Sequence, residues 1–330
     1  MTSIRLSLFK DSLLGIRNAE DFERLALDTF RWQFRHISVY REWCDLLGIK
    51  QAEVRRLDDI PFLPISFFKT HHVRPADMPV QKIFLSSGTG GSRSRHELVD
   101  EDLYRYVSIK SFETRFGPLE GRPVFALLPH YLENGDSSLV SMCRYFMEYS
   151  GHPDSGFFLD NESALVDLLK SGFPEEKPAV LFGAAYALLD LAEAHPLNLK
   201  NVQLFETGGM KGRKKEMIRK DLHTRLRKGF GLKKIYSEYG MTELLSQAYL
   251  NDEDAFECPP WMQLRLRDAR NPLDRSNSKR RGCINVIDLA NRYSCSFIAT
   301  DDLGKRTVHG ISVLGRLDKA DIRGCNLLVV

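Results

Sequence analysis

The chain has 330 residues, of which 43% are hydrophobic and 28% charged, and it carries a formal net charge of +3. These values indicate a soluble globular protein with one large domain or two, and so mild a charge argues against nucleic-acid binding. The first ten residues contain no sustained apolar run, so we expect no signal peptide, no membrane span and a cytoplasmic location. The six cysteines show no disulfide framework, which predicts reduced thiols, and without a histidine pattern a zinc site is disfavoured.

The first 75 residues predict a helical N-terminal region. Asn18 can cap a helix with Asp21 at its third position, and a stripe then falls on one face: Phe22, Leu25, Thr29 and Trp32. Residues 60–69 combine proline with apolar side chains, which predicts an extended segment laid across a sheet.

Residues 76–255 predict an α/β body. Apolar runs predict strands at 82–86, 124–128, 178–182, 201–206 and 233–237. Amphipathic stretches predict helices between them, at 101–113, 161–170 and 185–194. This alternation is typical of βαβ units and a parallel sheet.

A further helix is predicted over 212–228, with Ile218, Leu222 and Leu226 on an apolar stripe and many lysines and arginines elsewhere. Most such basic helix faces are simply solvated. The alternative is that this face binds an acidic partner, such as an acyl carrier protein. After residue 255 the pattern changes to short strands with turns, at 261–267, 283–289, 294–300 and 307–314. We therefore expect a small β-rich subdomain over 256–314 and a C-terminal tail over 315–330.

A loop of small residues follows the strand predicted at 82–86 and reads Ser86-Ser87-Gly88-Thr89-Gly90-Gly91-Ser92-Arg93-Ser94. Glycines let the backbone approach a ligand closely, and hydroxyl and N–H groups donate to phosphate oxygens. The loop lacks the Gly-Lys-Ser/Thr ending of a Walker A motif, and by itself it is as consistent with an ordinary turn.

The segment Tyr239-Gly240-Met241-Thr242-Glu243 ends another predicted strand. Tyr239 offers a flat face to an adenine, Gly240 lets the backbone come close, and Thr242 can donate to a phosphate. Glu243 can hold the Mg²⁺ of a nucleotide, because that ion takes one or two carboxylates together with phosphate oxygens. The alternative is a core tyrosine followed by an acid at a helix N-terminus.

Two later motifs carry further polar groups. Asp302, in Thr300-Asp301-Asp302, can accept both ribose hydroxyls, and Arg316, in Gly315-Arg316-Leu317-Asp318, can add a donor. The residues 301–304 are also typical of a turn, so a purely structural turn is the alternative to a ribose-binding role.

Two strand ends complete the set of candidates. Gly208 and Gly209 follow the strand at 201–206, where their backbone can line the adenine edge and the acyl pocket. His130 follows the strand that ends at Leu128 and is placed to border a carboxylate or acyl group. A structural histidine is nearly as consistent with the pattern.

The order of these motifs resembles that of adenylate-forming enzymes, which activate carboxylates as acyl-AMP with ATP and Mg²⁺. Within that superfamily the chain resembles LuxE-type acyl-protein synthetases and, more distantly, phenylacetate–CoA ligases. The likeness covers residues 60–330 and rests on segments 62–69, 86–94, 129–142, 206–209 and 322–325. It implies an α/β fold with parallel and mixed sheets flanked by helices, like the superfamily's large domain.

The resemblance also implies an activity. Such enzymes adenylate a fatty acid, pass the acyl group to a cysteine near their C-terminus, and hand it to a reductase partner. That cysteine corresponds to Cys325, and the partner would be an acyl-CoA-reductase-like protein or an acyl carrier protein. The substrate would be a fatty or aryl carboxylic acid. A carboxylate–CoA ligase with a separate lid domain, and a weakly catalytic scaffold that binds nucleotide or acyl carrier, remain alternatives.

Two departures from the superfamily stand out. Gly90 and Arg93-Ser94-Arg95 replace a second threonine and a lysine of the usual phosphate loop, and an arginine presents its charge in a different geometry. The chain ends 14 residues after Arg316, so we expect no C-terminal lid domain and no lid lysine to drive adenylation.

Overall fold

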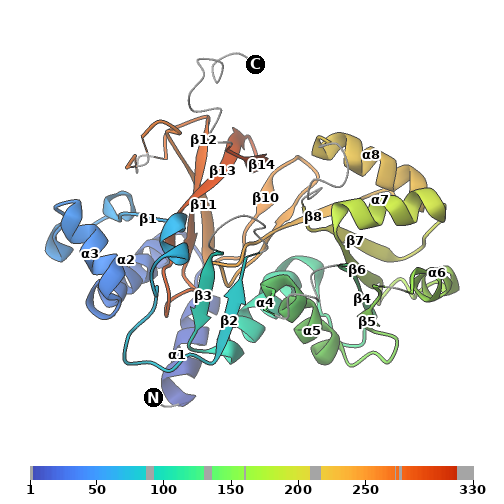
Figure 1. The fold of residues 1–330 in the computed structure, drawn as a ribbon, viewed down its shortest axis with the longest axis horizontal. Coiled ribbons are helices and arrows are strands. Elements are labelled where there is room, and N and C mark those ends of the chain that lie inside the picture. Colours follow the sequence, from blue (N-terminus) through green and yellow to red (C-terminus); the bar gives the residue numbers. More distant parts are fainter. Residues whose placement is uncertain are drawn as a thin grey trace. The chain divides into compact units, whose positions relative to one another are not determined.

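A computed structural model describes residues 3–86, 93–129, 136–159, 161–208, 217–271, 273–274 and 277–317, with side chains from residue 8 onward (Figure 1). The chain forms two compact units, one from residues 1–107 and 242–330 and one from residues 108–241. We call them unit 1 and unit 2 and describe each by itself. The domain boundaries expected from the sequence remain a prediction.

Unit 2 is built on a parallel sheet in the order β5-β4-β6-β7-β8. Its strands are β4 (Val124–Leu127), β5 (Gly156–Phe157), β6 (Ala179–Gly183), β7 (Val202–Glu206) and β8 (Tyr236–Tyr239). The parallel pairing confirms the predicted βαβ organisation. The prediction of a strand at 233–237 was wrong at its start, because Lys233 is exposed and pairing with β7 begins only at Tyr236.

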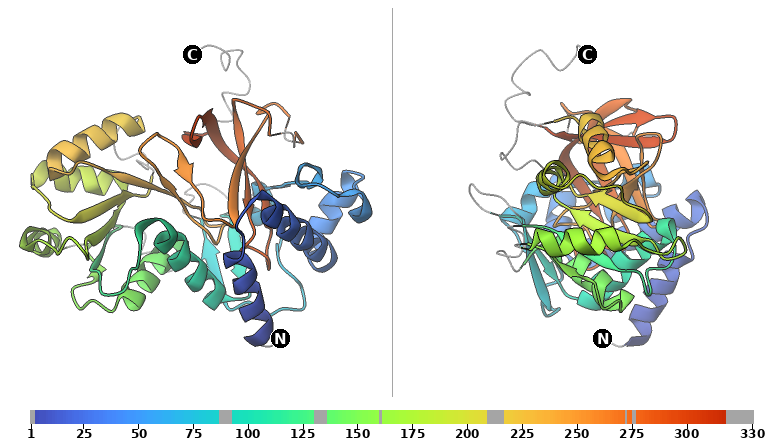
Figure 2. Two further views of the ribbon diagram at one scale, coloured as in Figure 1. Left: turned by 180° about the vertical axis from the view of Figure 1, so that it is seen from behind. Right: turned by 90° about the vertical axis from the view of Figure 1, so that its right-hand side faces the viewer.

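Helices cover both faces of this sheet (Figure 2). The helices α6 (Glu162–Ser171), α7 (Ala185–Ala194) and α8 (Arg219–Phe230) share one core with Leu181, Leu204 and Ile235. The opposite face carries phenylalanine rings that pack against α5 (Ser138–Ser150) and the second half of α4 (Glu101–Phe116). Alternate residues along each strand therefore enter two different cores.

Two helices of unit 2 differ from expectation. The last helix begins at Arg219 rather than near residue 212, and Ile218, which was expected on its apolar stripe, precedes it and is 67% exposed. Leu222 and Leu226 are buried as predicted. The helix α5 was not predicted; Ser137 caps it by accepting a hydrogen bond from the Val140 N–H.

Unit 1 contains a largely antiparallel sheet in the order β11-β12-β13-β14-β10-β9, and β1 pairs in parallel with β13. Its strands are β1 (Leu63–Pro64), β9 (Ala248–Leu250), β10 (Phe256–Glu257), β11 (Met262–Arg267), β12 (Arg281–Asp288), β13 (Phe297–Thr307) and β14 (Gly310–Arg316). A separate hairpin joins β2 (Lys82–Leu85) and β3 (Arg95–Leu98). The mixed α/β class and the series of turn-linked strands are confirmed. The strands are not short, however: β12 has 8 residues, and β13, expected at 294–300, has 11, because each pairs with antiparallel neighbours on both sides.

The N-terminal helices belong to unit 1. They are α1 (Ser3–Leu14), α2 (Ala19–His36) and α3 (Ser38–Leu46), and short 3₁₀ helices follow at Gln51–Glu53, Leu57–Asp59 and Ile65–Lys69. The last of these corrects the expectation of an extended segment over 60–69, which is extended only as far as Pro64. Asn18 caps α2 as predicted, with its side chain accepting from the Asp21 N–H.

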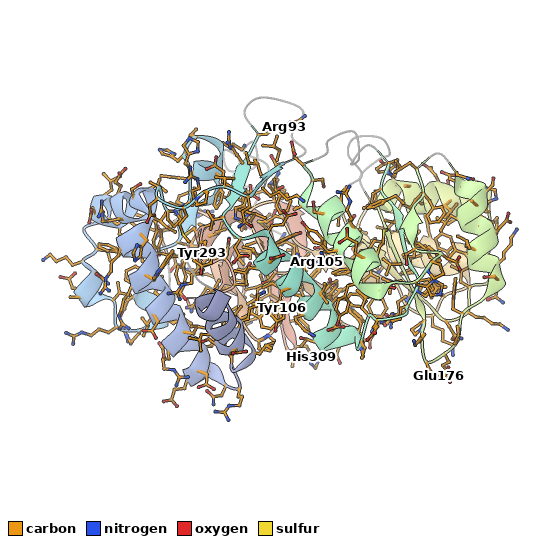
Figure 3. All side chains as sticks on the ribbon, turned by 90° about the horizontal axis from the view of Figure 1, so that it is seen from below. Arg93, Arg105, Tyr106, Glu176, Tyr293 and His309 are labelled. Carbon is orange, nitrogen blue, oxygen red and sulfur yellow. The ribbon has the colours of Figure 1, made fainter. Side chains whose placement is uncertain are left out.

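Aromatic contacts attach these helices to the rest of unit 1 (Figure 3). The Lys10 ammonium lies 4.8 Å from the centroid of the Tyr106 ring, and the rings of Trp32 and Tyr293 meet edge to face at 5.5 Å. No helix in the part of the chain that the structure describes combines the length and apolar composition needed to span a bilayer.

Candidate functional site

Two serines, Ser86 and Ser94, pair at the two ends of the Ser/Gly loop. The Ser86 N–H donates to the Ser94 carbonyl at 3.0 Å, and the Ser94 N–H donates to Ser86 Oγ at 2.9 Å. These bonds extend the β2–β3 hairpin by one further pair, so the hairpin closes the loop at its base. The predicted phosphate-binding residues Ser87, Gly88, Thr89 and Gly91 lie outside the described residues.

Two buried side chains of unit 1 fix the backbone of Thr242 and Glu243. His96 Nδ1, on β3, lies 2.8 Å from the Thr242 carbonyl oxygen, and Asn291 Nδ2 donates to the Glu243 carbonyl at 2.7 Å. Burial lowers the pKa of His96 to about 4, so the ring is neutral near pH 7 and its Nδ1–H is the donor to Thr242. The strand that leaves the Ser/Gly loop thus positions the Thr-Glu motif.

Glu243 is the centre of a polar group in unit 1. Its side chain is buried, and burial raises its pKa, with the nearby Asp302 acting in the same direction. A hydrogen bond with Ser94 and the charge of Arg316 favour the ionised form instead. Three residues that the sequence places in three separate motifs therefore influence the Glu243 carboxyl group.

Asp302 and Arg316 face each other across β13 and β14. They are register partners, and Arg316 Nε lies 3.9 Å from Asp302 Oδ1. The Asp302 side chain is 16% exposed and that of Arg316 is 74% exposed, so the pair borders solvent. Because residues 301–304 lie inside β13, the alternative interpretation of this segment as a turn is wrong.

The donor set around Glu243 fits a magnesium nucleotide. Mg²⁺ keeps most of its ligands as water and phosphate oxygens and needs one or two carboxylates from the protein. Glu243 supplies a buried carboxyl of this kind, with the Asp302 carboxyl near enough to influence it. Within the described ranges no group of three metal-ligating side chains occurs.

In unit 2 a buried carboxylate organises the ends of β7 and β8. Glu206 Oε2 accepts the Gly208 N–H at 2.7 Å, and Ser237 donates its hydroxyl to Glu206 Oε1. From α8, His223 Nε2 lies 3.6 Å and Arg219 Nε 3.9 Å from the same oxygen. Burial raises the pKa of Glu206, but the hydrogen bonds from His223 and Ser237 and the charge of Arg219 outweigh it and hold the pKa below its usual value.

Gly208 and Tyr239 stand at the ends of these two strands. Gly208 has φ +71°, a left-handed conformation that favours glycine, and a side chain there would point into open space. Tyr239 is the last residue of β8 and is 8% exposed, and Gly240 follows it. Both strand ends thus carry the predicted residues, whereas Gly209 and His130 lie outside the described residues.

The described cysteines are poor candidates for an acyl acceptor. All five are free, and four of them are buried. Burial raises the pKa of Cys44 and of Cys258 to about 12, so neither forms a thiolate near neutral pH. Cys325, the predicted acceptor, lies outside the described residues.

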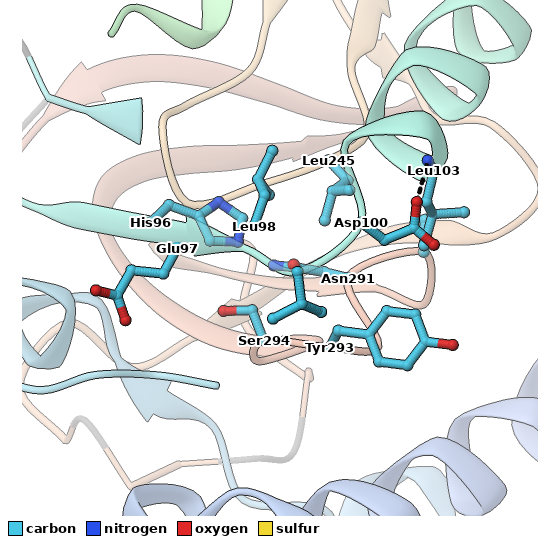
Figure 4. Close-up of a pocket in the computed structure, with 11 residues that line it drawn as sticks. His96, Glu97, Leu98, Asp100, Leu103, Leu245, Asn291, Tyr293 and Ser294 are labelled. Carbon is cyan, nitrogen blue, oxygen red and sulfur yellow. Dashed lines mark hydrogen bonds between the residues drawn. The ribbon is translucent and has the colours of Figure 1, made fainter. Parts of the chain in front are cut away.

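A cavity of about 10 Å³ lies beside His96 and Asn291 (Figure 4). Its wall includes Leu98, Leu245 and Ser294. This volume holds about one water molecule, which excludes it as a binding site for an acid or a nucleotide.

Sequence reasoning missed three residues that organise the site: His96, Asn291 and Glu206. His96 and Asn291 act on Thr242 and Glu243 from 146 and 48 positions away. No pattern of neighbouring residues in the sequence predicts contacts over such separations. Glu206 belongs to the segment 206–209, which carries part of the resemblance, but only the fold shows that its partners are Ser237 and residues of α8.

Comparisons with known proteins agree with this architecture. No protein-family model matches the chain. A stretch of 74 residues, 22% of this chain, is 34% identical to a long-chain-fatty-acid–luciferin-component ligase of Photorhabdus luminescens. The matched stretch spans 63% of that relative.

The fold matches solved ligase structures over most of the chain. A 2-hydroxyisobutyryl-CoA ligase in complex with its acyl-AMP and CoA has a TM-score of 0.67 at 16% identity, covering 92% of this chain and 70% of that one. The postadenylation state of that ligase gives a TM-score of 0.69 at 16% identity, with coverages of 91% and 68%. A luciferase-like enzyme from the mealworm Zophobas morio gives 0.51 at 15% identity, with coverages of 74% and 60%. The chain therefore shares the fold of these solved ligase structures, and one stretch of it is similar in sequence to a long-chain-fatty-acid–luciferin-component ligase.

Proposed function

We propose that this protein uses ATP to activate a carboxylic acid as acyl-AMP and then transfers the acyl group to a protein thiol. The observation that carries the proposal is the grouping of Glu243 with Ser94, Asp302 and Arg316 in unit 1. It joins carboxylates, a hydroxyl and a cation, the groups that a magnesium nucleotide requires. The fold and the partial match to a fatty-acid ligase support the same chemistry.

Each motif has a role in this proposal. The Ser/Gly loop and Thr242 bind the phosphates, Tyr239 and the Gly208–Gly209 segment bind the adenine, and Asp302 with Arg316 binds the ribose. Glu243 would hold Mg²⁺, which neutralises phosphate charge while the acid displaces pyrophosphate. His130 would border the carboxylate of the acid.

The acceptor thiol is the finer part of the proposal. The partial match to a luciferin-component ligase and the position of Cys325 favour acylation of the protein itself. The five described cysteines are disfavoured, since burial raises the pKa of each. A partner that reduces or carries the acyl group would complete the turnover.

A carboxylate–CoA ligase is the second candidate, because the matched solved structure with bound CoA belongs to a CoA ligase. Radiolabelled fatty and aryl acids, incubated with ATP in the presence and absence of CoA, separate the two. Label on the protein without CoA supports acyl transfer to a thiol, and label on CoA supports the ligase. Absence of label together with absence of pyrophosphate release contradicts both.

Replacing Glu243 tests the activation step itself. Glu243→Gln keeps the shape of the side chain and removes its charge, so acid-dependent pyrophosphate release should fall at least ~100-fold. Because burial already favours the neutral carboxyl, thermal stability should not fall with it. Activity within a factor of about two of the parent would show that Glu243 does not hold the metal.

A further inference from the structure

The hydrogen-bond partner of His96 fixes which of its two ring nitrogens carries a hydrogen. His96 Nδ1 lies 2.8 Å from the Thr242 carbonyl oxygen, and a carbonyl oxygen can only accept, so Nδ1 is the donor. Burial keeps the ring neutral near pH 7, because it lowers the pKa of His96 to about 4. A neutral ring with its hydrogen on Nδ1 has a bare acceptor at Nε2.

The amide of Asn291 is oriented by the same kind of contact. Its Nδ2 donates to the Glu243 carbonyl at 2.7 Å and to the Cys295 carbonyl at 3.0 Å. Because both partners are acceptors, the amide nitrogen and not the amide oxygen must face them. Asn291 Oδ1 is therefore a second acceptor, on a side chain that also holds the backbone of the Thr-Glu motif.

Neither acceptor receives a hydrogen bond from the protein. His96 Nε2 and Asn291 Oδ1 are both buried, and neither has a hydrogen-bond partner in the part of the chain that the structure describes. Asn291 lies close enough to His96 to favour protonation of the ring, but two acceptors cannot bond to each other. A buried acceptor without a donor is costly, so this pair calls for a donor from outside the chain.

The small cavity described above gives such a donor its place. His96 and Asn291 both line it, and Figure 4 draws the two side chains next to each other on its wall. Its volume of about 10 Å³ admits one water molecule and no larger group. The Ser294 hydroxyl, from another residue of this wall, donates to the Val73 carbonyl at 2.8 Å, so its hydrogen is not available to either acceptor.

We propose that this cavity binds one water molecule, which donates one hydrogen to His96 Nε2 and the other to Asn291 Oδ1. Water fits the site because it is neutral and carries two donors, which is the number of orphaned acceptors. The bridge stabilises the His96 tautomer that donates to Thr242 and the Asn291 orientation that donates to Glu243. The water site itself does not require the proposed function, but its role in holding Glu243 ready for Mg²⁺ rests on it.

A crystal structure of the wild-type protein tests the bridge directly. One ordered water should lie within about 3.2 Å of both His96 Nε2 and Asn291 Oδ1. Ser294→Ala is the matched control, because it removes a hydroxyl of the same wall that takes no part in the bridge, and it should retain the water. Asn291→Leu removes one of the two acceptors and should lose the water. If that variant does not fold, the wild type and Ser294→Ala still decide the question.

The tautomer of His96 gives an independent test in solution. In wild-type protein labelled with ¹⁵N-histidine, Nδ1 should be protonated and Nε2 unprotonated at pH 7, and His96→Gln identifies these signals by their loss. A ring proton of His96 should also show a nuclear Overhauser effect to a long-lived water. His71, an exposed histidine of the same unit, is the internal control and should show no such water.

Two results would overturn the inference. The first is a wild-type crystal structure without a water in contact with both atoms, or loss of that water in Ser294→Ala. The second is a hydrogen on Nε2, because the ring would then donate to Asn291 itself and need no bridge. The proposed function is judged separately, by acid-dependent pyrophosphate release. If the water is present and no acid supports release, the proposed function is wrong and the water site stands. If acids are activated and the water is missing, the adenylation proposal survives and the bridge is wrong.

Discussion

Asp302 is a carboxylate that borders solvent and lies in β13, just before the register of β13 and β14 shifts between Leu303 and Gly304. Its N–H donates to Thr300 Oγ1 at 3.1 Å, and that hydroxyl donates to the Ile284 carbonyl at 2.7 Å. The threonine therefore shapes the backbone, and the Asp302 side chain, which is 16% exposed, lies beside Arg316.

Asp302→Ala should weaken ATP binding by about 2–4 kcal/mol, because two hydrogen bonds to a charged acceptor are lost. Calorimetric titration with ATP and Mg²⁺ measures the effect. Asp301→Asn, at an exposed position of the same strand, is the matched control and should bind like the wild type. Unchanged binding in Asp302→Ala would refute the assignment of Asp302 to the ribose.

His96 should make the stability of the protein pH-dependent. Burial lowers its pKa from 6.5 to about 4, so the folded state binds fewer protons than the unfolded state between these values. The stability that the neutral His96 ring contributes is therefore fully present above pH 6.5. It is lost as the pH falls from 6.5 through 4.

The prediction is tested with His96→Asn, whose amide can still donate to the Thr242 carbonyl but does not titrate. Urea unfolding at pH 6.5 and pH 4.5 should show a loss of about 2–3 kcal/mol in the wild type that is absent from the variant. The variant itself should be less stable at both values, because the asparagine fills less of the site. Parallel pH dependence in the two proteins would contradict the prediction.

At the scale of elements, one carboxylate joins a helix to two strand ends. Glu206 belongs to β7, Ser237 to β8, and His223 and Arg219 to α8. The same carboxylate accepts the Gly208 N–H, so the orientation of α8 and the start of the glycine segment share a single anchor.

Glu206→Gln should destabilise the protein by about 2–3 kcal/mol, because it removes a buried charge that satisfies several donors. Glu193→Gln, which removes an exposed pairing with Arg225 at 4.0 Å, should cost less than about 0.5 kcal/mol. Denaturant unfolding of the two variants measures both effects. Equal effects in the two variants would show that the network adds nothing beyond a surface ion pair.

At the scale of the whole molecule, the question is whether a cysteine of the chain itself can accept the acyl group, so that turnover needs no CoA. If Cys325 is the acceptor, its thiolate attacks the carbonyl carbon of the acyl-adenylate, the bond to the phosphate oxygen breaks, and AMP leaves. Cys325→Ser should then keep pyrophosphate release and lose the hydroxylamine-labile label on the protein.

Cys258→Ser is the control, because Cys258 is the one described cysteine that is not fully buried. It should label like the wild type, since burial raises its pKa to about 12. Persistent label on Cys325→Ser at the parental level would rule out this acceptor and favour the CoA ligase.

Local pattern was enough to predict most of the elements. Alternation of apolar runs and amphipathic stretches predicted the parallel sheet of unit 2, and the polar signature at Asn18 predicted its cap. The errors lie where a local pattern has no tertiary partner. Ile218 has the spacing of a buried residue but precedes α8, and the run at 233–237 contains lysines that remain outside the sheet.

The sequence by itself determined the fold class and the candidate chemistry, because periodicity and short motifs are local properties of the chain. The order of the motifs along the chain also indicated which residues are expected to bind phosphate, base and ribose. Only the tertiary structure decided which groups act on one another. It brought Ser94, Asp302 and Arg316 to Glu243, set His96 behind Thr242, and kept Glu206 ionised. Burial and electrostatic coupling depend on neighbours far apart in the chain, and those neighbours exist only after folding.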